Sequence, residues 1–332
     1  MAKRRHRRLR LFPLFIILLI LGGGLYGAYY LYDYEHDKKV AAENRRKEEE
    51  KRQKLEAYNK CITTKYYSAY KPSSVEEKED AILSYIRQNN LSVSIYYQDI
   101  NTGYTFTYNE DKVYYGCSLI KLVDTLYLLD KINSGEISFD TKVPYNKAYY
   151  MKDNPCMEKY PPGEDIELSK VIECALTVSD NIAHRIMINY IGFNALQTYG
   201  RSLGAKNILT GGDAYGMQSA RDMNIYLNKL YQDLKDYPTS GNIIKGWMNN
   251  TYWNHLAFDQ TSMIHKYGYY GDNYHDVGIY FTEHPYLISI LTLHGNGSYI
   301  NVTNTLSKKI NELHNIYDKE VTSSCHKKVY GN

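Results

Sequence analysis

The sequence predicts an α+β fold, an αβα sandwich in which one antiparallel sheet is formed from both ends of a domain and a helical subdomain is inserted between them. Two groups of strands predict this. Residues 91–110 indicate a β-hairpin, because apolar and polar residues alternate on both sides of the turn signal INTG. Residues 262–294 indicate three consecutive antiparallel strands, while the segment between the two groups has mainly helical periodicity.

The helices of this fold are indicated by their first residues and by apolar spacing. Residues 73–89 begin with serines and acidic residues, which favours a helix N-terminus. A second helix is expected to begin at Ser118, because the apolar residues that follow would bury one face. Further helices are expected over residues 168–178, 181–190, 195–203, 219–234 and 242–250, with a closing helix over 303–316.

The N-terminus combines a basic cluster with a long apolar run. Six of the first ten residues are Lys or Arg, and without them the chain, whose formal net charge is +3, is slightly acidic. This balance argues against a nucleic-acid partner. Residues 11–32 carry no charge and are long enough as a helix to cross a bilayer. A cleaved signal peptide is the alternative.

Charge also predicts the topology and the organisation of the chain. Positive residues before the apolar run favour a cytoplasmic N-terminus in a single-pass protein of the cell membrane, with all that follows outside. Residues 38–56 mix charges of both signs, which is typical of a solvated helical stalk. We expect five parts: a cytoplasmic basic segment, a membrane anchor, a charged stalk or linker, a folded domain and a C-terminal tail, over residues 1–10, 11–32, 33–73, 74–318 and 319–332.

The cysteines and histidines indicate neither a disulfide framework nor a metal site. The five cysteines are an odd number without C-x-x-C spacing, so at most two bridges could form. Cys117 beside Ser118 is expected to be a small buried residue. The histidines show no H-E-x-x-H or comparable spacing. We therefore expect no metal and no cofactor. Separately, we expect a monomeric protein.

Ser118 and Lys121 form the first candidate catalytic pair. An ammonium on the buried face of a helix must be paired or must lose its proton. Serine becomes a nucleophile when a neighbouring group removes its proton, and a lysine can do this when desolvation or a second cation lowers its pKa. Lys266, in HKYG on the first of the late strands, supplies a second cation.

A third polar cluster lies at a junction between two predicted helices. In TVSDN, which contains the only S-D-N of the chain, Ser179 can transfer a proton. Asn181 can hold a substrate amide and orient Lys121.

The elements CSLIK, TVSDN and HKYG, in this order, resemble the S-x-x-K, S-D-N and K-T-G motifs of class A β-lactamases and penicillin-binding proteins. The likeness covers roughly residues 74–317 and implies a β-lactamase/transpeptidase-like fold. It also implies that Ser118 is the acylated nucleophile, that Lys121 is its base and that Ser179 relays the proton to the leaving nitrogen.

The resemblance extends to substrate binding. It implies that Asn181 binds the substrate amide and that Lys266 supplies positive potential for a substrate carboxylate. It further implies an oxyanion hole made by the backbone N–H groups of Ser118 and Tyr269, the residue after Gly268.

Two departures from the family pattern bear on activity. Tyr267 stands where the family has Thr or Ser, so the hydroxyl that would bind a substrate carboxylate is displaced or absent. The stretch AKNILTGGDAYGMQSARDM also contains no glutamate, whereas class A enzymes use one there to activate the deacylating water. Asp213 is the only carboxylate in the loop itself, before the helix expected from residue 219, and the glycines beside it suggest a plain turn.

The sequence thus predicts a membrane-anchored, extracytoplasmic serine hydrolase that is acylated at Ser118 by β-lactams or D-alanyl peptides. Three hypotheses remain open: a β-lactamase, a peptidase of cell-wall metabolism that penicillins trap, and a wall-facing binding or sensor module without turnover. The expected partners are a β-lactam or peptidoglycan peptide, and the membrane through the N-terminal helix.

Overall fold

The computed structural model describes residues 11–63, 71–209, 212–256, 262–293 and 299–331. The chain divides into two compact units, Met1–Cys61 with His326–Asn332, and Ile62–Cys325. The predicted basic segment, residues 1–10, lies outside the described residues, and so does part of the predicted linker. All three motifs lie in the second unit.

The N-terminal helix α1 (Leu11–Thr63) runs without a break for 53 residues. Within the described part of the chain it is the one helix long and apolar enough to cross a membrane, a test that a signal sequence also passes. The charged helix expected over 38–56 is present, with ion pairs one turn apart such as Lys47 to Glu43 at 2.7 Å. Pairs at this spacing stabilise an exposed helix modestly.

The main sheet joins the two ends of the second unit. Its strand order is β2-β1-β9-β8-β7, and every neighbouring pair is antiparallel. Both predicted strand groups are confirmed, and the register places Ile95 opposite Ile290. β7 is an edge strand. The strands are β1 (Val93–Asp99), β2 (Thr105–Tyr108), β7 (Met263–Tyr270), β8 (Asn273–Tyr280) and β9 (Tyr286–Leu293).

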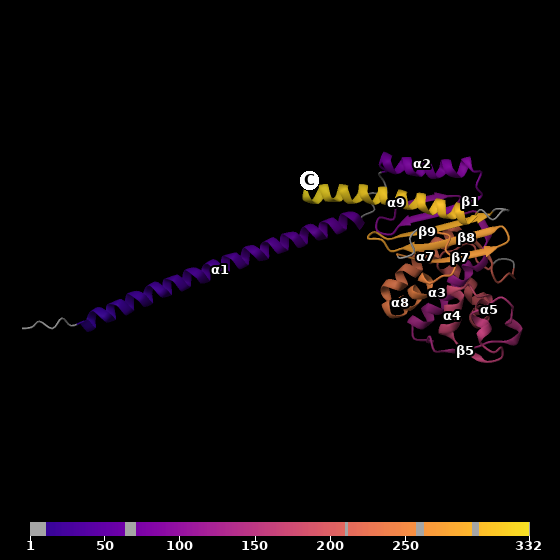
Figure 1. Ribbon diagram of the computed structural model, residues 1–332, viewed down its shortest axis with the longest axis horizontal. Helices are drawn as coiled ribbons and strands as arrows, with labels where there is room; N and C mark the ends of the chain where they lie inside the picture. The colour runs from indigo at the N-terminus through magenta and orange to yellow at the C-terminus, as the bar shows by residue number, and fades with distance from the viewer. Residues whose placement is uncertain (1–10, 64–70, 210–211, 257–261, 294–298, 332) are drawn as a thin grey trace, which may run out of the picture. The chain divides into compact units, whose positions relative to one another are not determined.

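Helices cover both faces of this sheet, as the sandwich prediction requires (Figure 1). α2 (Ser73–Gln88) and α9 (Tyr299–Tyr330) lie along one face, where the buried His314 contacts Tyr97 of β1 at 2.9 Å. α9 is longer than the predicted closing helix, because buried residues continue at helical spacing through Val321. α7 packs against the other face.

The inserted helical subdomain shares its core with that second face. The predicted helices are present with boundaries shifted by a few residues, and their apolar sides form one buried cluster. They are α3 (Ile120–Asn133), α4 (Leu168–Thr177), α5 (Asn181–Ile191), α6 (Phe193–Ser202), α7 (Ala220–Asp236) and α8 (Pro238–Asn249). Two short ribbons that the sequence did not predict are β3 (Val113–Tyr115) with β6 (Met217–Ser219), and β4 (Lys142–Pro144) with β5 (Asp165–Glu167).

A disulfide ties a loop of the helical subdomain to a helix. Cys156 and Cys174 are bonded, with Cα atoms 5.5 Å apart, so the loop before β5 is tied to α4. Cys117 is a free thiol, and its side chain is buried, as expected. The sequence analysis allowed for at most two bridges but identified no pairing, because sequence spacing does not reveal that a loop folds back onto a helix 18 residues later.

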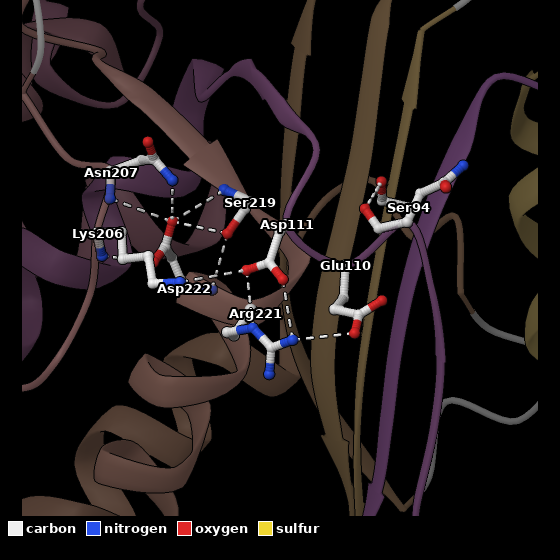
Figure 2. A network of polar contacts seen from close by, with 9 residues as sticks. Ser94, Glu110, Asp111, Lys206, Asn207, Ser219, Arg221 and Asp222 are labelled. Carbon is white, nitrogen blue, oxygen red and sulfur yellow. Dashed lines mark hydrogen bonds and ion pairs between the residues drawn. The ribbon is translucent and has the colours of Figure 1, made fainter.

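The start of α7 holds the segment that precedes it (Figure 2). Ser219 and Asp222 form a reciprocal capping box. The buried Asp222 carboxylate also accepts the backbone N–H of Lys206 at 2.8 Å and that of Asn207 at 3.3 Å. One carboxylate therefore fixes both ends of the loop that contains Tyr215.

Candidate active site

The backbone around Ser118 is held in an unusual conformation. Ser118 lies in the 3₁₀ turn η2 (Cys117–Leu119) that leads into α3. Cys117 has φ +50° and Ser179 has φ +59°, which is the left-handed region that side chains other than glycine rarely adopt. Such strain persists only where the surrounding structure enforces it, and it is concentrated at functional sites.

Lys121 is completely buried and lies among oxygen acceptors. Its Nζ is 2.8 Å from Ser118 Oγ and 2.8 Å from Asn181 Oδ1. It also donates to the Ser179 carbonyl at 2.5 Å. Burial lowers the pKa of Lys121 to about 7, against the opposing charges of nearby carboxylates. A large fraction of this lysine is therefore neutral near pH 7 and able to accept the Ser118 proton.

Ser179 connects the two lysines. Its Oγ lies 3.2 Å from Lys121 Nζ and 2.9 Å from Lys266 Nζ. Lys266 is also fully buried, and burial, followed by the charge of Lys121, lowers its pKa well below the usual value. The Ser179 hydroxyl can thus exchange a proton with either amine.

Asp180 and Asn154 hold the S-D-N junction in place. Asp180 caps α5 by accepting the N–H groups of Ile182 at 2.9 Å and Ala183 at 3.0 Å, and it also accepts that of Met157. Asn154 Oδ1 accepts the Asn181 N–H at 2.7 Å. The sequence analysis did not identify Asn154, whose only signal was the turn sequence DNP.

Gly268 allows β7 to approach the turn that contains Ser118. A Cβ at this position would lie 3.1 Å from Cys117 Cβ and 3.2 Å from the Gly116 carbonyl oxygen. The edge strand and η2 are in contact, and Tyr269, which is predicted to supply an oxyanion donor, follows Gly268 directly. The glycine is therefore required for close packing of the strand against η2.

A cleft of about 600 Å³ contains these groups. Five of the eight predicted site residues line it: Ser118, Ser179, Asn181, Tyr267 and Tyr269. Lys121 and Lys266 do not line the cleft but donate hydrogen bonds to Ser118 and Ser179, respectively. Gly268 does neither. Apart from Ser118, Ser179 and Asn181, half of the described lining residues are aromatic: Tyr115, Tyr215, Tyr252, Trp253, Tyr267, Tyr269 and Tyr270.

Tyr267 contributes a ring to this lining. Its side chain is 9% exposed, and burial raises its pKa to about 12, so the hydroxyl stays protonated. The ring is nearly parallel to that of Trp253, with centroids 6.2 Å apart and an interplanar angle of 22°. The sequence analysis noted Tyr267 but missed Trp253, because a tryptophan in a loop after α8 has no periodic signal.

A buried pair behind the cleft was also missed. Asp124 Oδ2 lies 2.6 Å from His184 Nδ1, and His184 Nε2 lies 3.2 Å from the Ala214 carbonyl oxygen. The adjacent Tyr215 ring lies 4.8 Å from the imidazole and 5.9 Å from Lys121 Nζ. The signal in the sequence was an aspartate inside the apolar run of α3.

Asp213 is placed as a turn residue. Its Oδ1 accepts the N–H of Tyr215 at 2.8 Å, and the side chain is exposed beside the cleft rather than among its described lining residues. The described residues contain no group of three or more His, Cys, Asp or Glu side chains that could hold a metal.

Comparison with known proteins agrees with this geometry. Residues 76–314 match the model of the Beta-lactamase enzyme family. Beta-lactamase AER-1 of Aeromonas hydrophila is 31% identical over 110 residues, which are 32% of this chain and 35% of that protein. The match thus spans about a third of this relative's length.

Solved structures show the same fold. A mutant of PBP-A, in an acyl-enzyme complex with penicillin G, has a TM-score of 0.65 at 17% identity, covering 73% of this chain and 96% of its own. An ancestral class A β-lactamase has a TM-score of 0.61 at 18% identity, and the match covers 71% of this chain and 99% of that one. At such identities the likeness shows the β-lactamase/transpeptidase-like fold alone. Because the family model covers more than half of the sequence, this chain belongs to the Beta-lactamase enzyme family.

Proposed function

We propose that the protein acts by acyl transfer through Ser118 on β-lactams or D-alanyl peptides. The observation that carries this proposal is the contact of Ser118 Oγ with a buried lysine at 2.8 Å, whose pKa burial lowers to about 7. Neutral Lys121 takes the proton as Oγ attacks the carbonyl carbon. The N–H groups of Ser118 and Tyr269 stabilise the oxyanion that forms.

A proton relay then protonates the leaving nitrogen. A proton passes from Lys121 to Ser179 Oγ at 3.2 Å, and the Ser179 hydroxyl delivers its proton as the C–N bond breaks. Lys266, which donates to Ser179 at 2.9 Å, orients this hydroxyl. Asn181 orients Lys121 and binds the substrate amide.

The absence of a poised base among the described lining residues favours the penicillin-binding, D-alanyl-peptidase alternative over a fast β-lactamase. The carboxylates among the described lining residues are Asp153 and Asp180. Three backbone N–H groups occupy the oxygens of Asp180, and Asp153 is exposed. Neither is a poised base for water at Ser118, so we expect the acyl-enzyme to persist.

We also propose that α1 anchors a catalytic domain, residues 74–318, outside the cytoplasm. The apolar part of α1 and the basic residues before it support this topology. The disulfide between Cys156 and Cys174 supports an oxidising compartment. Protease treatment of intact cells that carry the protein should remove the domain and leave an N-terminal fragment in the membrane.

Intact-protein mass spectrometry of the full chain in detergent tests the chemistry. The protein is followed over time with penicillin G and with a cephalosporin, beside Ser118→Ala. A persistent adduct of drug mass supports the penicillin-binding alternative, and a transient adduct with drug consumption supports a β-lactamase. No adduct with either drug contradicts acyl transfer and leaves a binding module as the remaining hypothesis.

A further inference from the structure

Two groups of aromatic side chains line the cleft that contains Ser118. The first, here called the Trp253 group, consists of Tyr252, Trp253, Tyr267 and Tyr269. The Trp253 ring is nearly parallel to the rings of Tyr267 and Tyr269, with centroid distances of 6.2 Å and 6.4 Å. In the second group, the ring centroid of Tyr115 lies 5.8 Å from that of Tyr270 and 6.3 Å from that of Tyr215. The nucleophile therefore opens into a space bounded by flat apolar faces.

Positive charge is scarce on the same surface. The described lining residues include no Lys or Arg, but they include the carboxylates of Asp153 and Asp180. Lys266 is completely buried, and its ammonium donates to Ser179 Oγ and to the Tyr267 carbonyl at 2.8 Å. A negatively charged ligand would thus find the exposed carboxylate of Asp153 and no Lys or Arg among the described lining residues of the cleft.

The Tyr267 ring separates Lys266 from the cleft. Lys266 Nζ lies 4.3 Å from the centroid of the Tyr267 ring, and the ring lines the cleft whereas the lysine does not. A small hydroxyl residue at this position would leave the ammonium nearer to a bound ligand and could itself donate to a carboxylate. The tyrosine replaces that polar contact with an aromatic face.

We propose that the cleft selects acyl donors by an aromatic acyl side chain that stacks in the Trp253 group, and that a carboxylate on the leaving group contributes little to recognition. The inference rests on the proposed acyl transfer at Ser118 and names the class of acyl donor that this site takes. Offset stacking with several rings favours an aryl group over a methyl group of the same charge.

Four matched peptides separate the two parts of this inference. They are phenylacetylglycyl-glycine, its C-terminal amide, and the two corresponding acetyl compounds, titrated by calorimetry into full-length Ser118→Ala protein in detergent. We expect each phenylacetyl peptide to bind at least about tenfold more tightly than its acetyl partner. We expect each acid and its amide to differ by less than about threefold. An acid that binds about tenfold more tightly than its amide, or equal binding of acetyl and phenylacetyl peptides, overturns the inference.

Two substitutions in the Ser118→Ala background attribute the effects to residues. Trp253→Leu should abolish the preference for phenylacetyl, whereas Tyr237→Leu, which removes an exposed tyrosine outside the cleft, should leave it unchanged. Tyr267→Thr should create a preference for the acid of about tenfold. If Trp253→Leu retains the preference, the aromatic group assigned here is wrong.

Failure of the inference differs from failure of the proposed function. Binding is measured without the nucleophile, whereas acylation of the wild-type protein by penicillin G is measured by mass. Acylation together with a strong preference for the acids rejects the inference and keeps the function. Phenylacetyl preference without any acylation of Ser118 rejects the function and keeps the ligand class of the cleft.

Discussion

Lys121 Nζ lies 2.8 Å from Ser118 Oγ, and none of the lysine side chain is accessible to solvent. Water would normally solvate the ammonium, and its exclusion favours the neutral amine. Four contacts to oxygen atoms of Ser118, Ser179 and Asn181 fix the position of Nζ. Geometry and burial together make this lysine the base of the site.

The pH dependence of acylation should follow Lys121. Its pKa is lowered to about 7, so the reactive neutral form is lost as the pH falls below that value. We expect the second-order rate constant for adduct formation to rise about tenfold per unit up to pH 7 and then to level off. Rates measured between about pH 5 and pH 9 check this. A midpoint near the ordinary pKa of lysine would contradict the assignment.

Asp124→Asn should shift this profile to lower pH. The Asp124 charge raises the pKa of Lys121, so its removal should lower the midpoint by up to about one unit. The contact with His184 at 2.6 Å makes some loss of stability unavoidable, so the profile is compared with thermal unfolding of the same variant. Asp140→Asn, at an exposed aspartate, is the control and should change neither.

Gly268→Ala should separate β7 from the turn that contains Ser118. The new Cβ would lie 3.2 Å from the Gly116 carbonyl oxygen, which the backbone cannot easily move. We expect acylation to slow at least about tenfold, with a cost of about 1–3 kcal/mol from overpacking. Gly246→Ala, in α8 with open space around it, should instead stabilise the protein by about 0.5–1 kcal/mol. Equal effects of the two changes would argue against close packing at Gly268.

Asp222 and Arg221 are neighbours whose substitutions should destabilise the protein to very different extents (Figure 2). Asp222→Ala breaks the capping box with Ser219 and leaves the partly buried N–H groups of Lys206 and Asn207 without this acceptor, so we expect a loss of about 2–4 kcal/mol. Arg221→Gln removes partly exposed ion pairs with Asp111 and should cost at most about 1 kcal/mol. Urea unfolding of both variants measures the difference, and a larger effect of Arg221→Gln would contradict this ranking.

The disulfide near the cleft should contribute measurable stability. It closes a loop with a separation of 18 residues between Cys156 and Cys174, for which chain entropy predicts about 3 kcal/mol. The double variant Cys156→Ser/Cys174→Ser should unfold at a lower temperature. Cys117→Ser, which removes a free thiol, is the matched control for loss of a cysteine. An unchanged Tm in the double variant would mean that the bond is dispensable.

Local patterns allowed most of the fold to be predicted. Alternation located β1, β2 and the three late strands, and apolar spacing located the helices, because each element must bury one face of its own. The same reasoning ended α9 too early, since its later buried residues contact parts of the fold distant in sequence. The three-residue ribbons were missed because so short a strand has no pattern to detect.

Residue chemistry in sequence order determined the candidates Ser118, Lys121, Ser179 and Lys266, since nucleophile, base and proton relay need particular side chains at a helix start and on a strand. Only the tertiary structure decided how these groups behave. Burial lowers the pKa of Lys121, and the Tyr267 ring, stacked on a loop tryptophan, covers Lys266. Desolvation and stacking arise between segments distant along the chain, and sequence spacing does not encode them.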